Sequence, residues 1–221
     1  MPVNKLAILW DMDGTMIDTR DCHFQTWQRA LEYFGFNFDK SVYQQNFGRN
    51  NDVLLPLLLG FEPDAAVKQS IIKKKEGLFR EMAPGAVSLV PGLADWLSTA
   101  RDWQLKQAVA SSASIENITV MLSHYQLETY FDAVVSGDDL PAKPAPDVFL
   151  KAAKQVGTNP ANCLVIEDSP AGIRAAKNAG MRCVAVGTYH LEAEFLDTDA
   201  VVENFRQPLA AVLDQIGLSM P

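Results

Sequence analysis

The hydrophobic positions of this chain form short apolar runs that alternate with helical repeats. The first run, residues 6–10, has the length of a fully buried strand and is followed by the turn signal Asp13-Gly14. From residue 93 onward the pattern predicts helices at 93–100, 115–125, 147–156 and 171–179, and strands at 106–110, 133–136, 163–166 and 183–186. Residues 200–202 add a candidate edge strand before a last helix. This alternation is typical of a parallel sheet with helices on both faces.

Residues 18–84 interrupt the alternation with an almost wholly helical pattern. A leucine-rich segment at 52–59 and a longer helix from Asp64 to Met82 follow a first helix that ends near Gly35. The apolar positions of that first helix are Phe24, Trp27, Ala30, Leu31 and Phe34. We therefore expect an α/β fold: a Rossmann-like three-layer core with a parallel sheet (residues 1–17 and 85–221) and an inserted α-helical domain (residues 18–84).

Composition narrows the classes of partner. The chain has 221 residues, 48% of them hydrophobic, and a formal net charge of −8. A net negative charge argues against nucleic acid or an anionic membrane as a partner, because both require a basic face. Three widely spaced cysteines indicate buried thiols in a reducing compartment, and no apolar run approaches the roughly 20 residues of a membrane span. We expect a monomeric cytoplasmic protein that acts on a small molecule.

Two carboxylates follow the first predicted strand. Asp11 and Asp13 stand one residue apart, directly before Gly14, at the carboxyl end of a strand, where open α/β sheets bind ligands. Two acids so close repel each other unless a cation lies between them. An oxygen-only ligand set favours Mg²⁺, although solvated turn acids are the simpler alternative.

Three later polar positions also follow predicted strands or begin helices. Ser111-Ser112 follows a strand and opens a helix, Lys143 precedes Pro144 at another helix entry, and Glu167-Asp168 ends the strand at 163–166. Taken singly, these are an ordinary helix cap, a solvated lysine and a capping acid pair. Their common placement at strand ends indicates one site that binds an anion and a metal.

In this order the motifs resemble those of the haloacid dehalogenase-like superfamily of aspartyl-phosphate hydrolases and phosphomutases, and the resemblance spans nearly the whole chain. It implies that Asp11 is the nucleophile and a Mg²⁺ ligand, and that Asp13 is the general acid and base and offers a backbone oxygen to the metal. It further implies that Ser111, Ser112 and Lys143 hold the transferred phosphoryl group. Asp168, assisted by Glu167, would complete the metal shell.

The helical insertion stands just after the first motif, where this superfamily has its cap domain. Within the superfamily the chain is most similar to the β-phosphoglucomutase-like branch, which includes sugar-phosphate phosphatases; the matching stretches are residues 18–27 and 142–149. The resemblance implies that His23, Lys75 and the loop at 48–52, with Arg49 and Asn51, face the substrate. Helical projection independently places His23 among the apolar positions of its helix and Lys75 among those of the helix that ends at Met82. A buried histidine with its hydrogen bonds satisfied and a snorkelling lysine are the alternatives.

Three functions fit these motifs. The first is a Mg²⁺-dependent phosphatase that hydrolyses a small phosphorylated metabolite, a sugar phosphate, through an aspartyl-phosphate intermediate. The second is a β-phosphoglucomutase-type mutase, which needs a second phosphate pocket; Ile115 and Glu116 stand where such mutases offer a polar contact to that phosphate. The third, a non-catalytic sensor of phosphorylated ligands, is disfavoured because four buried carboxylates without metal chemistry would be unfavourable.

Overall fold

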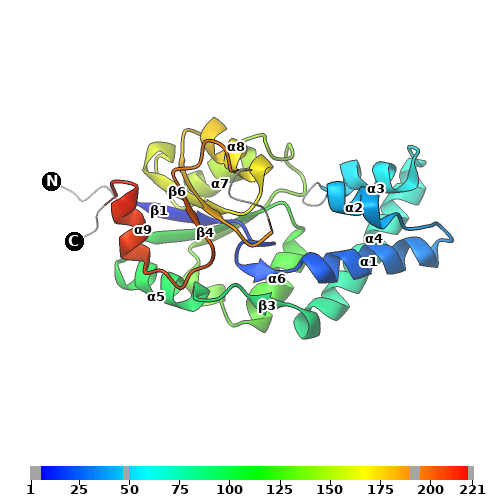
Figure 1. Ribbon diagram of the computed structural model, residues 1–221, viewed down its shortest axis with the longest axis horizontal. Coiled ribbons are helices and arrows are strands. Elements are labelled where there is room, and N and C mark those ends of the chain that lie inside the picture. The colour runs from blue at the N-terminus through cyan, green and yellow to red at the C-terminus, as the bar shows by residue number, and fades with distance from the viewer. Residues whose placement is uncertain (1–5, 47–49, 190–194, 219–221) are drawn as a thin grey trace. The chain divides into compact units, whose positions relative to one another are not determined.

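The computed structural model describes residues 6–46, 50–189 and 195–218 and divides into two compact units (Figure 1). The core unit comprises the chain up to Asp18 and from Ser88 onward, and the cap unit is Thr19–Val87. Within the described residues, no helix is both long and apolar enough to cross a membrane.

The core unit contains a six-stranded sheet in the order β5-β4-β1-β6-β7-β8. All neighbouring strands are parallel, which confirms the predicted α/β class. The strands are β1 (Ala7–Trp10), β4 (Lys106–Ser111), β5 (Ala133–Ser136), β6 (Cys163–Glu167), β7 (Arg182–Val186) and β8 (Ala200–Val202). Because the chain builds outward from β1 through β4 to β5 and then returns to β6, the strand order reverses next to β1, where such sheets place ligands.

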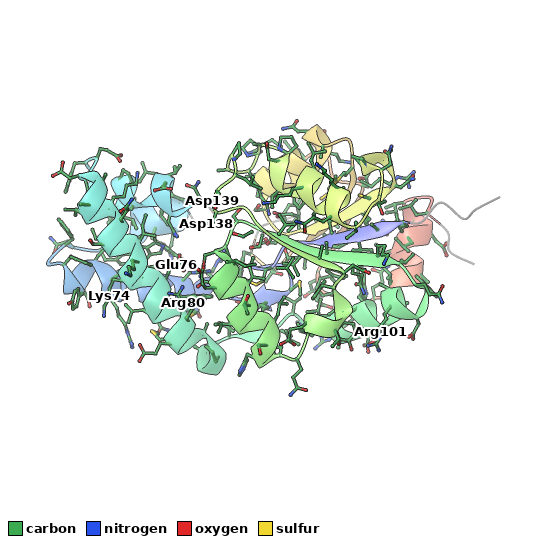
Figure 2. All side chains as sticks on the ribbon, turned by 180° about the vertical axis from the view of Figure 1, so that it is seen from behind. Lys74, Glu76, Arg80, Arg101, Asp138 and Asp139 are labelled. Atoms are coloured by element: carbon green, nitrogen blue, oxygen red, sulfur yellow. The ribbon has the colours of Figure 1, made fainter. Side chains whose placement is uncertain are left out.

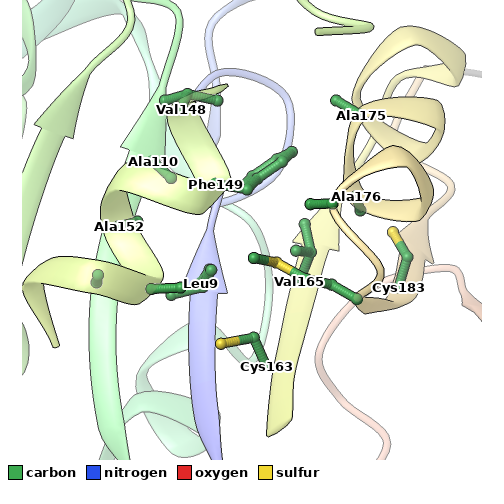
Figure 3. Close-up of a cluster of buried hydrophobic side chains, with 14 of the residues drawn as sticks. Leu9, Ala110, Val148, Phe149, Ala152, Cys163, Val165, Ala175, Ala176 and Cys183 are labelled. Atoms are coloured by element: carbon green, nitrogen blue, oxygen red, sulfur yellow. The ribbon is translucent and has the colours of Figure 1, made fainter. Parts of the chain in front are cut away.

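Helices cover both faces of this sheet. They are α5 (Leu93–Asp102), α6 (Ile115–His124), α7 (Asp147–Gln155), α8 (Pro170–Asn178) and α9 (Leu209–Gln215), with short 3₁₀ turns η1 (Glu128–Tyr130) and η2 (Pro160–Asn162). On one face Leu9 and Val165 join a buried cluster with Phe149 of α7 (Figure 3). On the other face Trp10 meets Trp96 of α5, at 6.3 Å between ring centroids. Three layers result, as predicted.

The described residues of the cap unit form four helices: α1 (Arg20–Tyr33), α2 (Lys40–Gln45), α3 (Asn51–Leu59) and α4 (Ala65–Ala86). Its core includes Trp27, Leu31, Leu55 and Ile71. The sequence pattern did not predict α2, a single short helix whose first N–H groups are capped by the carboxylate of Asp39. Helix α4 continues past Met82 to Ala86 and includes Pro84, which removes one backbone N–H donor from its last turn.

The two connections between the units form a small ribbon that the sequence did not reveal. Strand β2 (Ile17–Asp18) pairs antiparallel with β3 (Ser88–Leu89), so the chain leaves and re-enters the core at adjacent positions. Two-residue strands carry no recognisable alternation, which explains why the pattern missed them. The cysteines Cys22, Cys163 and Cys183 are buried thiols outside any disulfide, as expected.

Candidate active site

Asp11 directly follows β1 and lies at the carboxyl edge of the sheet. The Asp11 N–H donates to the carbonyl of Ile166 (N···O 3.0 Å), so Asp11 extends the pairing between β1 and β6 by one residue. Its side chain is buried, whereas that of Asp13 is partly exposed. Because β4 and β6 flank β1 in parallel, the residues that end these strands gather at the same edge as Asp11.

Gly14 makes the turn after β1 possible. Its φ of 85° is a left-handed conformation that favours glycine. A Cβ built on Gly14 would lie 2.1 Å from Oδ2 of Asp168 and 2.7 Å from Cε2 of Tyr189. Asp168 also accepts a hydrogen bond from the hydroxyl of Thr15 (3.2 Å). Because Gly14 has no side chain, the turn of the first motif can lie against the carboxylate of Asp168 in the last motif.

Lys143 joins two carboxylates in the interior of this site. Its ammonium donates to Oδ1 of Asp11 (2.6 Å) and to Oε1 of Glu167 (2.7 Å), and its nitrogen lies 4.8 Å from the ring centroid of Phe149. The side chain is 8% exposed, so the sequence alternative of a solvated lysine is wrong. Burial alone would lower the pKa of Lys143, but the charges of Asp11 and Glu167 hold that pKa above its ordinary value.

The negative charge of the site exceeds what Lys143 balances. Burial raises the pKa of Asp11 to about 7; Lys143 opposes this rise, and Glu167 and Asp13 add to it. Burial, followed by repulsion from Glu167 and Asp11, raises the pKa of Asp168 well above its ordinary value. Both carboxylates thus lie where a further cation would favour their charged forms.

Glu167 is held by donors on both of its oxygens. Oε1 accepts from Lys143, and Oε2 accepts from the backbone N–H (2.6 Å) and the hydroxyl (3.0 Å) of Ser169. A Cβ on Gly172 would lie only 1.7 Å from Oε1, so glycine is needed for α8 to begin this close to the carboxylate. The Ser169-Pro170 pair indicates a helix start in the sequence, and Ser169 is indeed the N-cap of α8. The contacts of Ser169 and Gly172 with Glu167 were not predicted.

Ser111 is buried at the end of β4, and Ser112 is exposed beside it. The hydroxyl oxygen of Ser111 accepts from the N–H of Ala113 (3.1 Å). The expectation that Ser111-Ser112 opens the following helix is corrected in one respect: the N-cap of α6 is Ser114, which accepts from the N–H of Asn117 (3.3 Å). The first two serines form the turn before this cap, near the positive end of α6.

The carboxylates of this site can be compared with the ligands that Mg²⁺ requires. No three His, Cys, Asp or Glu side chains of the described residues lie close enough together to enclose a metal ion. Mg²⁺ requires less than an all-protein cage, since it commonly takes one or two carboxylates and completes its shell with water and substrate phosphate. The buried, mutually repelling carboxylates of Asp11 and Asp168 fit that requirement.

The cap unit gathers three of the four predicted cap residues. Lys75 Nζ lies 3.1 Å from Nδ1 of His23, and the same ammonium donates to Oε1 of Glu76 (2.8 Å). Asn51 donates its side-chain N–H to that Glu76 oxygen as well (2.6 Å). Sequence reasoning missed Glu76, because one acid beside a lysine on a helix is a common surface pattern. The fourth predicted residue, Arg49, lies outside the described residues.

A family model for haloacid dehalogenase-like hydrolases matches residues 8–186, a stretch that contains all four motifs. The chain belongs to this family. It is 31% identical over 183 residues to the fructose-1-phosphate phosphatase YqaB of Escherichia coli (strain K12), across 81% of this chain and 95% of the relative. It is 32% identical over 191 residues to the β-phosphoglucomutase of Bacillus subtilis (strain 168), across 82% of this chain and 83% of the relative.

A solved structure of a haloacid dehalogenase-type relative has the same fold. A crystal structure of a CbbY mutant from Rhodobacter sphaeroides in complex with xylulose-(1,5)bisphosphate superposes with a TM-score of 0.85 at 26% identity, covering 97% of this chain and 99% of that chain. Family membership and the named phosphatase relatives confirm that the chain is a phosphoric monoester hydrolase. The alternative of a non-catalytic sensor is therefore wrong.

Proposed function

We propose that this protein is a Mg²⁺-dependent phosphatase that hydrolyses a sugar phosphate or similar small metabolite through a phosphorylated Asp11. The observation that supports this most directly is the buried contact between Asp11 and Lys143 at the edge of the sheet, with Asp168 beside Gly14. A carboxylate is a weak nucleophile, so its attack on phosphorus depends on positioning and on nearby positive charge. This site supplies both.

In the first half-reaction an oxygen of Asp11 forms a bond to phosphorus while the bond from phosphorus to the ester oxygen breaks. Asp13 gives its proton to the departing oxygen, which leaves as an alcohol. Lys143 balances charge on the phosphoryl oxygens, because its ammonium lies 2.6 Å from the attacking carboxylate. Ser111 and Ser112, near the start of α6, bind the same group.

In the second half-reaction water attacks the phosphorus of the aspartyl phosphate. Asp13, now ionised, takes the proton from this water, the bond between Asp11 and phosphorus breaks, and inorganic phosphate leaves. Glu167 acts through Lys143, because its second oxygen is tied to Ser169 and its first holds the ammonium.

Asp11, the backbone of Asp13 and Asp168, assisted by Glu167, would hold the metal ion. When bound, Mg²⁺ supplies positive charge that stabilises the phosphoryl oxygens in the transition state. In the cap unit we propose that His23, Asn51 and Lys75 contact the part of the substrate that is not transferred, as does Arg49. The compound itself is then selected by these side chains and not by the core.

A phosphatase fits better than a mutase at one position. A mutase must hold a bisphosphorylated intermediate at both ends, and residues 113–116, at the entry to α6, contain no cation. Ile115 and Glu116 are both exposed there. The similarity to a β-phosphoglucomutase keeps isomerisation as the second candidate.

The purified protein can be assayed with p-nitrophenyl phosphate and a panel of sugar phosphates, with Mg²⁺ and with chelator, measuring both free phosphate and isomerised sugar. We expect Mg²⁺-dependent phosphate release and no isomerisation when a sugar bisphosphate is added in catalytic amount. Full turnover in chelator would overturn the metal dependence. Bisphosphate-dependent isomerisation of β-glucose 1-phosphate in excess of phosphate release would establish the mutase instead.

A further inference from the structure

Two hydrogen bonds connect the end of β5 to residues 111–114, the serine turn that leads from β4 into α6. The backbone N–H of Gly137 donates to the carbonyl of Ser111 (2.7 Å). The hydroxyl of Ser136 donates to the carbonyl of Ala113 (2.7 Å). Both carbonyls of the serine turn are therefore held toward β5.

These two bonds determine the direction of the N–H groups in the serine turn. In a trans peptide the C=O and N–H bonds point in opposite directions, and both peptides concerned are trans. The N–H groups of Ser112 and Ser114 therefore point away from their anchors on β5. For Ser112, which directly follows β4, this is the side of β1, because β4 lies between β5 and β1. The end of β5 thus directs a backbone donor toward the side on which Asp11 lies.

Gly137 allows β5 to approach the serine turn this closely. A Cβ built on Gly137 would lie 3.2 Å from the carbonyl oxygen of Ser111 and 3.4 Å from Cα of Ser112. The first of these distances is shorter than an ordinary van der Waals contact, so a larger residue would push the carbonyl away. The orientation of the serine turn therefore depends on both residues at the end of β5.

The connection that follows β5 also leads to Lys143. Figure 2 shows its exposed residues Asp138 and Asp139 just beyond the end of the sheet. The backbone N–H of Asp138 donates to the hydroxyl oxygen of Ser136 (3.2 Å), so this hydroxyl has both an acceptor and a donor as partners. Leu140 packs against the buried core cluster. One connection thus includes the anchor of the serine turn and the lysine of the site.

We propose that Ser136 is a positioning residue for the transferred phosphoryl group, because its hydroxyl holds the serine turn in the orientation that binds the anion. The inference rests on the proposed function and adds to it a residue that acts through the backbone of Ala113. An anion is bound by N–H groups and repelled by carbonyl oxygens, so a turn that loses this anchor binds phosphate less tightly.

The test measures two constants in the presence of Mg²⁺: the Kd of inorganic phosphate by isothermal titration calorimetry, and the KM for p-nitrophenyl phosphate. In Ser136→Ala we expect both to rise about 3- to 10-fold, the contribution of one hydrogen bond. Ser136→Thr keeps the hydroxyl and should restore both constants. Because the serine turn binds the group that all substrates share, KM for a sugar phosphate should rise by the same factor.

Thr198→Val is the matched control. The hydroxyl of Thr198 also donates to a backbone carbonyl, that of Cys183 (2.9 Å), but Cys183 lies near the start of β7, at the opposite edge of the sheet. This variant should lose stability as Ser136→Ala does and leave the Kd of phosphate and the KM unchanged. An equal rise of both constants in the two variants would mean that Ser136 acts only through stability, and would overturn the proposal.

Unchanged constants in a folded Ser136→Ala variant would overturn the proposal as well. If Ser136→Ala fails to fold, Gly137→Ala tests the same anchor, since its Cβ would displace the carbonyl of Ser111. Raised constants in that variant support the proposal, and unchanged constants overturn it. Absence of turnover for every phosphate ester in the wild-type protein would instead contradict the proposed function, which the Kd of phosphate does not measure.

Discussion

The ammonium of Lys143 lies 2.6 Å from the carboxylate of Asp11, and the two side chains are equally buried, each 8% exposed. Lys143 also donates to Glu167, so a single cation contacts two buried acids. We therefore expect Lys143 to contribute both to the proposed mechanism and to the stability of the core unit.

Replacing Lys143 by methionine should therefore affect both. Removing one partner of a buried ion pair costs about 3–5 kcal/mol, because the remaining charges are left uncompensated. We expect a clear fall in the melting temperature together with loss of turnover. Lys106→Met is the matched control, since Lys106 bonds Asp132 at 2.5 Å but is 43% exposed. Its loss should cost about 0.2–1 kcal/mol. Equal stability losses in the two variants would contradict the buried pairing.

Gly14→Ala should abolish activity while most of the fold remains. Its Cβ would fall 2.1 Å from Oδ2 of Asp168, so the carboxylate must move. Gly157 separates this effect from backbone strain, because its φ of 70° is similar but a Cβ there would meet nothing within 4 Å. Gly157→Ala should cost about 1–2 kcal/mol and leave kcat unchanged. Melting curves and steady-state kinetics of both variants decide the matter; normal kcat in Gly14→Ala would refute the close approach.

Asp13→Ala should lower kcat by about 10²- to 10⁴-fold, the range for a positioned general acid or base. The loss should be larger for an alkyl phosphate than for p-nitrophenyl phosphate, since p-nitrophenolate leaves without help from an acid. Steady-state rates on both esters provide the comparison. An unchanged rate on both would remove Asp13 from the mechanism.

Asp168→Asn should raise the Mg²⁺ concentration needed for half-maximal binding by about tenfold or more, the range expected when a metal site loses such a partner. Isothermal titration calorimetry with Mg²⁺ alone measures this without relying on turnover. Asp95→Asn, on the exposed side of α5, is the control. Identical titration curves for both variants would exclude Asp168 as a ligand.

Much of this site could be predicted because its residues lie next to strong local patterns. The apolar run before Asp11 predicts a strand, and Gly14 after Asp13 predicts a turn. A second apolar run predicts the strand that ends at Glu167, in the last motif. Parallel pairing then brings their ends together regardless of the distance in sequence. The order of the motifs was sufficient to indicate the family.

Contacts that depend on side-chain direction could not be predicted in this way. Glu76 resembles any acid beside a lysine until the structure shows that it accepts from both Asn51 and Lys75. Tyr189 carries no motif, yet its ring edge lies against Gly14 and its hydroxyl donates to Asp18. Ser114 replaced Ser111-Ser112 as the helix cap because all three serines fit a cap equally well in sequence.

The central claim is that Asp11 becomes covalently phosphorylated. The most direct measurement is to mix enzyme, Mg²⁺ and substrate, quench in acid within one turnover, and determine by peptide mass spectrometry which peptide has gained a phosphoryl group. The account predicts the modification on the peptide that contains Asp11 in the wild-type protein, and neither modification nor turnover in Asp11→Asn. Phosphate attached elsewhere, or sustained turnover by Asp11→Asn with no modified peptide, would contradict it.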